Sequence, residues 1–427
     1  MNITKNNTKN IFEFYQIINL ILFRDILSLF ALIIIIQGCG SRMMEKRMQS
    51  KVPNESIDFK KHTINPSNIY WVGESHGTAL NYTIAFDLFC KIDSAVGVDY
   101  ILMESNYLQT HYLNNYMKSG DSNMLDLAFS SSVGTFGWTK EHKSYYERIY
   151  AHELKKAKEN RIQFVGIDIE HGYWHTHKFL IDSLIPSTIP DSKRIISQIR
   201  QPLRYSKDFL NYYTKLYDDI IHNEEKYKSI LRNQFELVKY LSKNICNITY
   251  CQSLSANLWN KTRDSLIYEN FKWHDQRLRF AQKVAFGLWG TDHIYQAPIK
   301  EGTTFIAGHI AKQQPEIKQT GYRMLYTKSS FNLPTFFIPN FVRWIYGDKK
   351  YIRTKAFNND KIWAKVSGLY FLKKRKNRGF KYPLSVDSVP KEIDLVGNKN
   401  TSSRNNKYFQ YVILVNKSRA CTPLRNN

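Results

Sequence analysis

Short apolar runs alternate with stretches of helical periodicity through the middle of the chain. Between residues 78 and 91, Leu80, Ile84 and Leu88 recur at helical spacing, and Thr78 is a plausible N-cap. Strands that alternate with helices predict an α/β fold, in which a mainly parallel central sheet is flanked by helices. The runs with the length and composition of buried strands lie at 69–72, 100–103, 162–167 and 284–289.

A longer helical pattern fills the region from about 192 to 282, where Tyr, Phe and Leu recur at helical spacing and glycines are few. We predict that this region is a helical insertion that forms a cap over the site. A further helix is expected at 141–160, and further strands at 335–338 and 411–415.

The N-terminus has the pattern of a secretion signal. Its uncharged stretch 26–37 is short for a membrane span but suits the core of a signal peptide, and it runs into Gly38 and Cys39. A small residue before a cysteine at this place resembles a bacterial lipobox, in which the cysteine is lipidated. We therefore predict a signal peptide at 1–38, a polar tether at 39–68 and an α/β domain at 69–427. The expected location is the bacterial cell envelope, with Cys39 as the membrane anchor.

The formal net charge of +24 favours anionic neighbours, such as phospholipid headgroups or nucleic acid. The one dense basic run, 373–378, favours a solvated loop, and the aromatic region 192–282 lacks a dense alternation of basic and aromatic residues. No nucleic-acid partner is therefore expected. Cys246 and Cys251 are close enough in sequence to pair in an oxidising compartment, and their spacing is not that of a metal site.

Each of the four early strands finishes in an ionisable group. The first strand ends at Glu74 and His76, the second at Glu104, the third at Asp168 and the fourth at His293. Ligands of open α/β sheets bind outside the carboxyl ends of parallel strands. Charged groups at the edge of a buried sheet also need partners or a chemical role. We therefore expect these five side chains to meet in one cleft.

The residue types indicate proton transfer. His76 titrates near neutral pH and can remove a proton from water. Glu74 or Glu104 can fix the tautomer of this imidazole, and His293 can be a second proton carrier. Water is favoured as the nucleophile over Ser75, which lacks the flanking glycines of a nucleophile elbow.

A metal site is the alternative use of the same residues. His76 and His293, with one or more carboxylates, could hold a divalent metal that acidifies a bound water. In either case, Gly73 and Gly77 permit close backbone approach, and the N-terminus of the following helix would favour a developing oxyanion.

Several motifs resemble the erythromycin esterase-like proteins and occur in the order of that family. They are "VGESHGTALN", "ILMES", "FVGID", "RDSLIYEN", "GLWGTDHI" and "IAGHIAKQQPEIKQTGYRMLY". The first block and the block with Arg263, Asp264 and Asn270 are the most specific. The Gly-x-x-His form of two blocks is also similar to a wider superfamily that includes TraB/Tiki metalloproteases and ChaN-like haem-binding lipoproteins.

The resemblance implies a hydrolase that acts on an ester, lactone or amide bond of a small-molecule or peptide substrate. His76 would be the general base on water and Glu74 its companion, with Glu104, Arg263 and His293 lining the pocket. The esterases usually carry a second histidine three residues before the one matched by His293, where this chain has Gly290. This difference favours the wider superfamily over macrolide-lactone hydrolysis.

Other residues are candidates for the pocket. Asp168, Trp138 and His309 are predicted to bind substrate, although Trp138 could be core and His309 could open a helix. His171 and His175 would share a helix face, as metal or haem ligands do, or could be exposed histidines. The alternative function is a haem- or metal-binding lipoprotein that uses the same cleft. The carboxylates and Arg263 favour the hydrolase, because they suit proton transfer better than an apolar porphyrin site.

Overall fold

The computed structural model describes residues 59–185, 207–339, 343–346, 349–355, 359–374, 383–397 and 403–424. All of them belong to one compact unit of the chain. The predicted signal peptide, Cys39 and the side chains of the basic run 373–378 lie outside the described residues. Phe59 is 6% exposed, and His62 Nε2 is hydrogen-bonded to the hydroxyl of Tyr322 (2.9 Å). Within the range predicted as a tether (39–68), Phe59 and His62 therefore pack onto the domain.

A seven-stranded sheet forms the centre, in the order β3-β2-β4-β1-β5-β9-β8. Its neighbouring strands are parallel except for the β8–β9 pair. The four strands predicted first are confirmed, and they are adjacent in the sheet. The strands are β1 (Ile69–Glu74), β2 (Tyr100–Met103), β3 (Gln163–Gly166), β4 (Ala285–Gly290), β5 (Gln319–Thr327), β8 (Leu384–Ser385) and β9 (Tyr411–Asn416).

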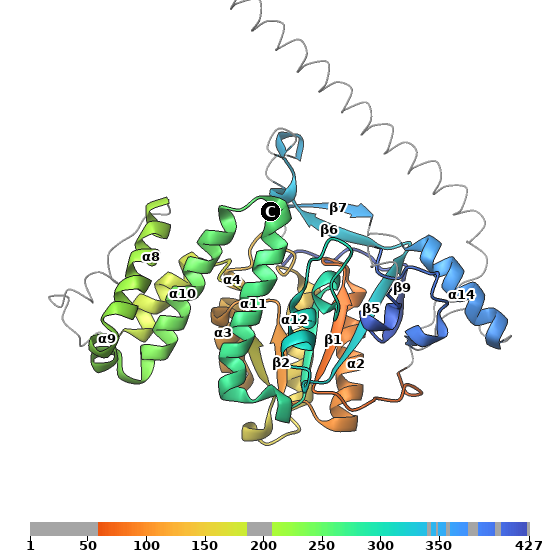
Figure 1. Cartoon of the computed structure of the whole chain (residues 1–427), viewed down its shortest axis with the longest axis horizontal. Helices are drawn as coiled ribbons and strands as arrows, with labels where there is room; N and C mark the ends of the chain where they lie inside the picture. Colours follow the sequence, from red (N-terminus) through yellow and green to blue (C-terminus); the bar gives the residue numbers. More distant parts are fainter. Residues whose placement is uncertain are drawn as a thin grey trace, which may run out of the picture. The chain divides into compact units, whose positions relative to one another are not determined.

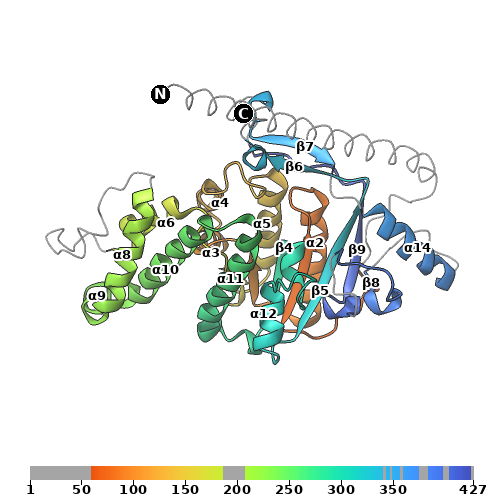
Figure 2. The same cartoon turned by 45° about the horizontal axis from the view of Figure 1, so that its top comes forward.

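Helices cover both faces of this sheet, which confirms the predicted α/β architecture (Figures 1 and 2). Successive residues of a strand point to opposite faces, so Tyr70 and Val72 join one core cluster while Ile69 and Trp71 join another. The first cluster includes α2 (Leu80–Val96), α4 (Ser122–Ser130) and α5 (Lys140–Glu153). The second includes α11 (Ala256–Leu278), α12 (Ile306–Gln313) and α14 (Asp360–Lys374).

The insertion is helical from residue 207 onward. Its helices build a third apolar cluster together with α3 and α6. Within α10, Cys246 and Cys251 are free thiols, so the pairing considered from the sequence is not formed. The helices of this part are α3 (Tyr107–Ser119), α6 (Tyr173–Phe179), α8 (Lys207–His222), α9 (Glu224–Leu231) and α10 (Phe235–Gln252).

Three local predictions need correction. The strand expected at 335–338 is a 3-10 turn, because the strand β6 (Ser330–Pro334) ends just before it and pairs with β7 (Tyr351–Lys355) in an antiparallel hairpin. The helix expected at 141–160 ends at Glu153. Thr78 does not cap α2; the hydroxyl of Ser418 accepts the hydrogen bond from the Leu80 amide instead (3.0 Å). Among the described residues, no helix combines the length and the apolar character needed to cross a bilayer.

Candidate active site

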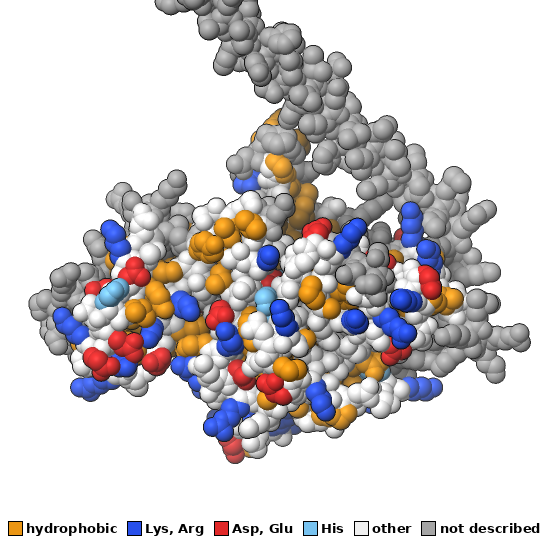
Figure 3. Space-filling view, viewed as in Figure 1, with side chains coloured by type: hydrophobic (Ala, Val, Ile, Leu, Met, Phe, Trp, Pro, Cys, Tyr) orange, Lys and Arg blue, Asp and Glu red, His pale blue; other side chains and the backbone are white. Residues whose placement is uncertain are grey.

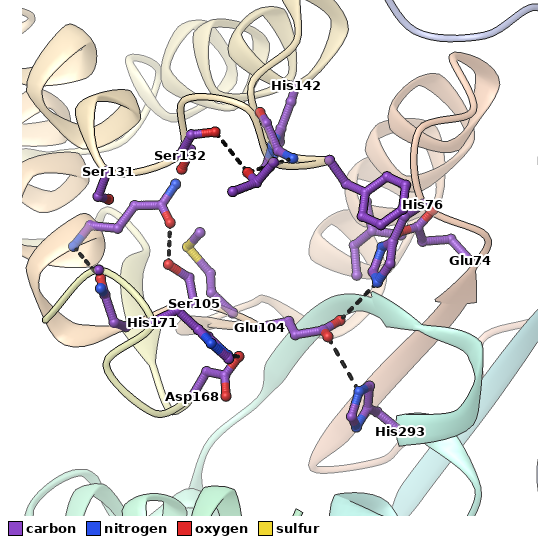
Figure 4. Close-up of a pocket in the computed structure, with 18 of the residues that line it drawn as sticks. Glu74, His76, Glu104, Ser105, Ser131, Ser132, His142, Asp168, His171 and His293 are labelled. Atoms are coloured by element: carbon purple, nitrogen blue, oxygen red, sulfur yellow. Dashed lines mark hydrogen bonds and ion pairs between the residues drawn. The ribbon is translucent and has the colours of Figure 1, made fainter. Parts of the chain in front are cut away.

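A cavity of about 750 Å³ lies at the carboxyl ends of β1 to β4. It brings together the residues predicted from the strand ends, so the common cleft is present. Figure 4 shows Glu104 between the two imidazoles, with His76 on one side and His293 on the other. The predicted residues that line it are Glu74, His76, Glu104, Asp168, Arg263 and His293.

The end of β1 holds a carboxylate–imidazole pair. Glu74 is 7% exposed, and its Oε1 contacts Nδ1 of His76, whose side chain is 38% exposed. The other oxygen of Glu74 accepts a hydrogen bond from the side-chain amide of Asn81. The Asn81 carbonyl oxygen in turn accepts from the hydroxyl of Tyr326 (2.8 Å). Asn81 and Tyr326 thus hold the carboxylate of Glu74 in position, while the ring of His76 reaches the cavity.

The loop after His76 is tied to the C-terminal part of the chain. Gly77 has φ +79°, and a Cβ there would lie 2.7 Å from the carbonyl oxygen of Asn332, so the position requires glycine. Its own carbonyl oxygen accepts from the Cys421 amide (2.8 Å), and the Ala79 amide donates to the Arg419 carbonyl (3.0 Å). The Leu80 amide donates to the Ser418 hydroxyl (3.0 Å), and the Asn81 amide donates to the Thr78 carbonyl (3.3 Å). The amides at the start of α2 therefore already have partners. The oxyanion site predicted at this helix N-terminus is not available.

Glu104, at the end of β2, connects the two halves of the site. Its Oε2 accepts from the Gly290 amide (2.7 Å) and lies 3.8 Å from His76 Nε2. Its Oε1 lies 2.9 Å from Arg263 Nη2 and 3.3 Å from His293 Nε2. Burial raises the pKa of Glu104, but the neighbouring cationic groups outweigh burial and hold it well below its usual range.

Arg263, from α11, pairs with a second buried carboxylate. Its Nε lies 3.0 Å from Asp168 Oδ1, and its Nη2 also donates to Oδ2 of the same residue. His171 Nε2 lies 3.2 Å from that carboxylate and lines the cavity. Burial raises the pKa of Asp168, but Arg263 and His171 outweigh this and lower it. Asp168 therefore stays ionised and fixes the guanidinium against Glu104.

His293 is held from behind by the residue next to Arg263. Its Nδ1 lies 2.8 Å from Asp264 Oδ1, which also accepts from the Ile306 amide (2.8 Å). Burial lowers the pKa of His293, but Asp264 and Glu104 raise it to about 10. His293 is therefore an imidazolium at neutral pH.

His76 is also more basic than the sequence suggests. Burial lowers its pKa, but Glu74 and Glu104 outweigh burial and raise it to about 9. The titration near neutrality that was expected from the residue type is thus shifted to alkaline pH. In the resting site, His76 is mostly protonated at pH 7.

The wall beside His76 is aromatic. The ring of Phe136 lies 5.2 Å from that of His76 and 5.3 Å from that of Phe337, measured between centroids. His142 is locked deeper in this wall, because Nδ1 lies 3.0 Å from the Gly137 carbonyl and Nε2 lies 2.7 Å from the Tyr146 hydroxyl. Burial lowers the pKa of His142 to about 4, so it is neutral.

The opposite wall is polar. Ser131 and His171 lie on the side of the cavity away from His76 (Figure 4). Gln109 and Asn260 also line the cavity, and Trp259 of α11 adds an indole beside His171. Within the described part of the insertion, the residues that line the cavity all come from α11. The cavity thus has an aromatic side and a polar side, with the ionised groups between them.

Two predicted substrate-binding residues lie elsewhere. Trp138 is 6% exposed and stacks on Tyr351, with the Lys350 ammonium 5.5 Å from its ring centroid. It belongs to the core, which was the alternative interpretation. His309 stacks on Tyr268 between α11 and α12 and does not line the cavity. The position of a residue in the sequence does not report the direction of its side chain.

The donor set does not favour a metal between His76 and His293. The guanidinium of Arg263 already lies 2.9 Å from Glu104 Oε1 and 3.1 Å from His293 Nε2, where a metal ion would have to bind. Elsewhere in the described residues, Asp93, His152 and Glu153 form the one cluster with metal-like spacing. The ammonium of Lys156 lies 2.9 Å and 2.8 Å from the two carboxylates of that cluster and supplies its cation.

Some functional residues were missed or given only a structural role. Asn81 was part of the quoted motif, but nothing marked it as the amide that holds Glu74. Asp264 was named only as part of a motif block, and it is fully buried behind His293. Asn270, from the same block, donates to the carbonyls of Ile167 (3.1 Å) and Asp168 (3.2 Å). The spacing of Asp264 and Asn270 along α11 was the available signal.

No protein-family model and no curated protein matches the sequence. Solved structures do match the fold. A protein of Bacillus cereus is 16% identical with a TM-score of 0.55, covering 86% of this chain and 93% of its own. A succinoglycan biosynthesis protein is 15% identical with a TM-score of 0.55, covering 83% of this chain and 89% of its own.

A variant of the erythromycin esterase EreC, in its open conformation, is also similar. It is 14% identical with a TM-score of 0.54, and the match covers 84% of this chain and 93% of the esterase. The resemblance to the erythromycin esterase-like proteins, predicted from the motifs, is thereby confirmed at the level of the fold.

Proposed function

We propose that this protein is a hydrolase that cleaves an ester, lactone or amide bond with a water molecule activated by His76. The observation that carries the proposal is the Glu74–His76 pair, which is fixed from behind and reaches a cavity lined by further ionised groups. Among the described residues, the hydrogen bonds of His76 include no serine hydroxyl, which supports water as the nucleophile.

The reaction then has two steps. Neutral His76 takes a proton from water through Nε2 while the water oxygen attacks the carbonyl carbon, and Glu74 stabilises the imidazolium through Nδ1. When the tetrahedral intermediate collapses, His76 returns this proton to the leaving alcohol or amine. The products are a carboxylic acid and that alcohol or amine.

Arg263 and His293 suit the stabilisation of developing charge. Both cations are held by buried carboxylates, so their positions are set before substrate binds. A fixed cation in a site that excludes water stabilises an oxyanion more strongly than a mobile one in solvent. These two groups replace the helix N-terminus that was expected to serve this purpose.

The basicity of His76 gives the proposal a kinetic signature. A base with a pKa of about 9 is unprotonated in only about 1% of molecules at pH 7. The value of kcat/KM should therefore rise with pH and level off above about pH 9. If His76 acted as an acid instead, activity would fall over the same range.

A substrate panel tests the assignment. Full-length wild type, His76→Asn and the control His222→Asn, which changes an exposed histidine of α8, are compared on esters, lactones and peptides. Loss of a general base should lower kcat about 10²- to 10⁴-fold, while the control keeps wild-type rates. Equal turnover by wild type and His76→Asn on every cleaved substrate would contradict the proposal.

We also propose that the hydrolase is anchored in the cell envelope through lipidated Cys39. The support is the sequence pattern of 26–39 alone. Mass spectrometry of the N-terminal peptide should find Cys39 as the first residue, carrying acyl chains. A peptide that retains residues 1–38 with a free Cys39 thiol would contradict the anchor.

A further inference from the structure

The turn of the β6–β7 hairpin exposes large hydrophobic side chains. Trp344 is 77% exposed and Ile345 is 61% exposed, and at the base of the turn Phe336 and Phe337 are 51% and 56% exposed. The hairpin projects beyond the central sheet at the top of Figure 1, and Figure 3 shows hydrophobic side chains on this projection. Soluble surfaces rarely gather such residues in one place unless they bind something.

Specific contacts hold this part of the hairpin in position. Arg343 Nη2 donates to the carbonyl oxygens of Phe336 (2.9 Å) and Ile338 (3.1 Å), which fastens the returning chain to the end of β6. The rings of Phe336 and Phe337 pack against each other with centroids 4.2 Å apart. Arg343 and the two phenylalanine rings are therefore held in position at the end of β6.

The sequence of the hairpin is rich in cations. Residues 330–355 contain five cationic residues and one acidic residue, Asp348. Lys349 is exposed in the turn, and Arg353 is exposed in the middle of β7, opposite Asn332. The cationic residues are Arg343, Lys349, Lys350, Arg353 and Lys355.

We infer that this hairpin tip docks onto the surface of a lipid bilayer that contains anionic headgroups. Exposed Trp and aliphatic side chains flanked by Lys and Arg are the pattern that inserts at the boundary between headgroups and acyl chains. Anionic lipid adds attraction for each nearby cation. A second copy of the chain is a poorer occupant, because a two-fold contact would bring identical cations face to face.

Docking at this tip would bring the cavity to the bilayer surface. Phe336 and Phe337 both line the cavity. The ring of Phe337 packs against that of Phe136, which in turn packs against the ring of His76. The predicted anchor permits this arrangement, since the twenty peptide steps from Cys39 to Phe59 span at most about 70 Å. The inference does not depend on hydrolysis, because it rests on the hairpin alone.

A fluorescent label at the tip tests the docking. The full-length Ile345→Cys variant is labelled with an environment-sensitive fluorophore and reconstituted in vesicles of phosphatidylcholine with phosphatidylglycerol. The matched control is Leu154→Cys, an exposed position (50%) at the end of α5, where the chain turns back toward the start of β3. Wild type treated with the same reagent gives the background from the native thiols.

The label at 345 should brighten several-fold, shift to shorter wavelength and be quenched by brominated lipids, while the label at 154 should not respond. Replacing phosphatidylglycerol with phosphatidylcholine, or adding Lys349→Glu, should weaken docking, because each cation contributes about fivefold in partitioning. Identical behaviour of both labels in anionic vesicles would overturn the inference. A shift at 345 that needs no lipid and grows with protein concentration would also overturn it, in favour of a second copy.

Discussion

Replacing Glu74 with Gln should lower the pKa of His76. The two carboxylates that raise this pKa are Glu74, in contact with Nδ1, and Glu104, 3.8 Å from Nε2. A unit charge about 4 Å away contributes about 4 kcal/mol at an effective dielectric constant of 20, or about 3 pKa units. Because the His76 side chain is 38% exposed, solvent screens part of this interaction. We expect a fall from about 9 by about 1–3 units.

The measurement is an NMR titration of protein labelled with ¹³C in the histidine rings. The resonance of His76 is assigned by its absence in His76→Asn. On a cleaved substrate, the rising limb of kcat/KM should move to lower pH by the same amount as the pKa. The control Asp126→Asn removes a carboxylate that is 65% exposed and paired with Lys143, and it should leave the titration of His76 unchanged.

Glu74→Gln also has a structural cost that must be separated from the electrostatic effect. The new amide can accept from either His76 or Asn81 but not from both, so one hydrogen bond is lost, at about 1 kcal/mol. Urea unfolding reports that loss. If the variant is folded and the pKa of His76 is unchanged, the charge of Glu74 does not set the basicity of the site, and the reasoning is refuted.

Four further outcomes are expected. The pKa of His293 is raised to about 10, so protonated His293 stabilises the fold fully below about pH 6.5, and this contribution is lost as pH rises through about 10. The Tm should therefore fall between these two pH values, and it should fall less in His293→Asn. Arg263→Met should cost about 3–5 kcal/mol in urea unfolding, because it leaves the buried carboxylates Glu104 and Asp168 unpaired; a loss below 1 kcal/mol would show that solvent already screens them. Gly290→Ala should lower kcat with little change in Tm, since the new Cβ would lie 3.1 Å from Nε2 of His76; unchanged kcat would mean that this ring can move freely. Titration with haem should leave the Soret band of free haem unshifted, because the ring nitrogens of His293 are already paired. A shift of this band that is lost in His171→Ala would favour the haem alternative.

The early strands could be predicted because each combines a short apolar run with an abrupt polar end. Strand β5 could not be predicted in this way, although its residues, Gln319–Thr327, are mostly buried. Its centre contains Arg323, which is 8% exposed and lies over the rings of Tyr295 and Phe409. In the sequence alone, an arginine indicates an exposed position, because the aromatic rings that stabilise it when it is buried are distant along the chain.

The site was predictable to the extent that parallel strands end at one edge. That rule brings Glu74, Glu104 and Asp168 together without knowledge of their contacts. It does not tell which carboxylate meets which cation, because Arg263 comes from a helix 159 positions away from Glu104. The direction of each side chain, as for Trp138 and His309, depends on packing between elements that the pattern does not place.

The tie between the His76 loop and the C-terminal segment has a consequence for synthesis. The amide of Leu80 and the hydroxyl that accepts its hydrogen bond, on Ser418, are 338 positions apart. During translation, the loop therefore leaves the ribosome long before the residues that fasten it. A nascent or prematurely terminated chain would carry His76 on a loop that is not yet fastened, so the proposed chemistry would have to wait until residues 418–421 join the fold.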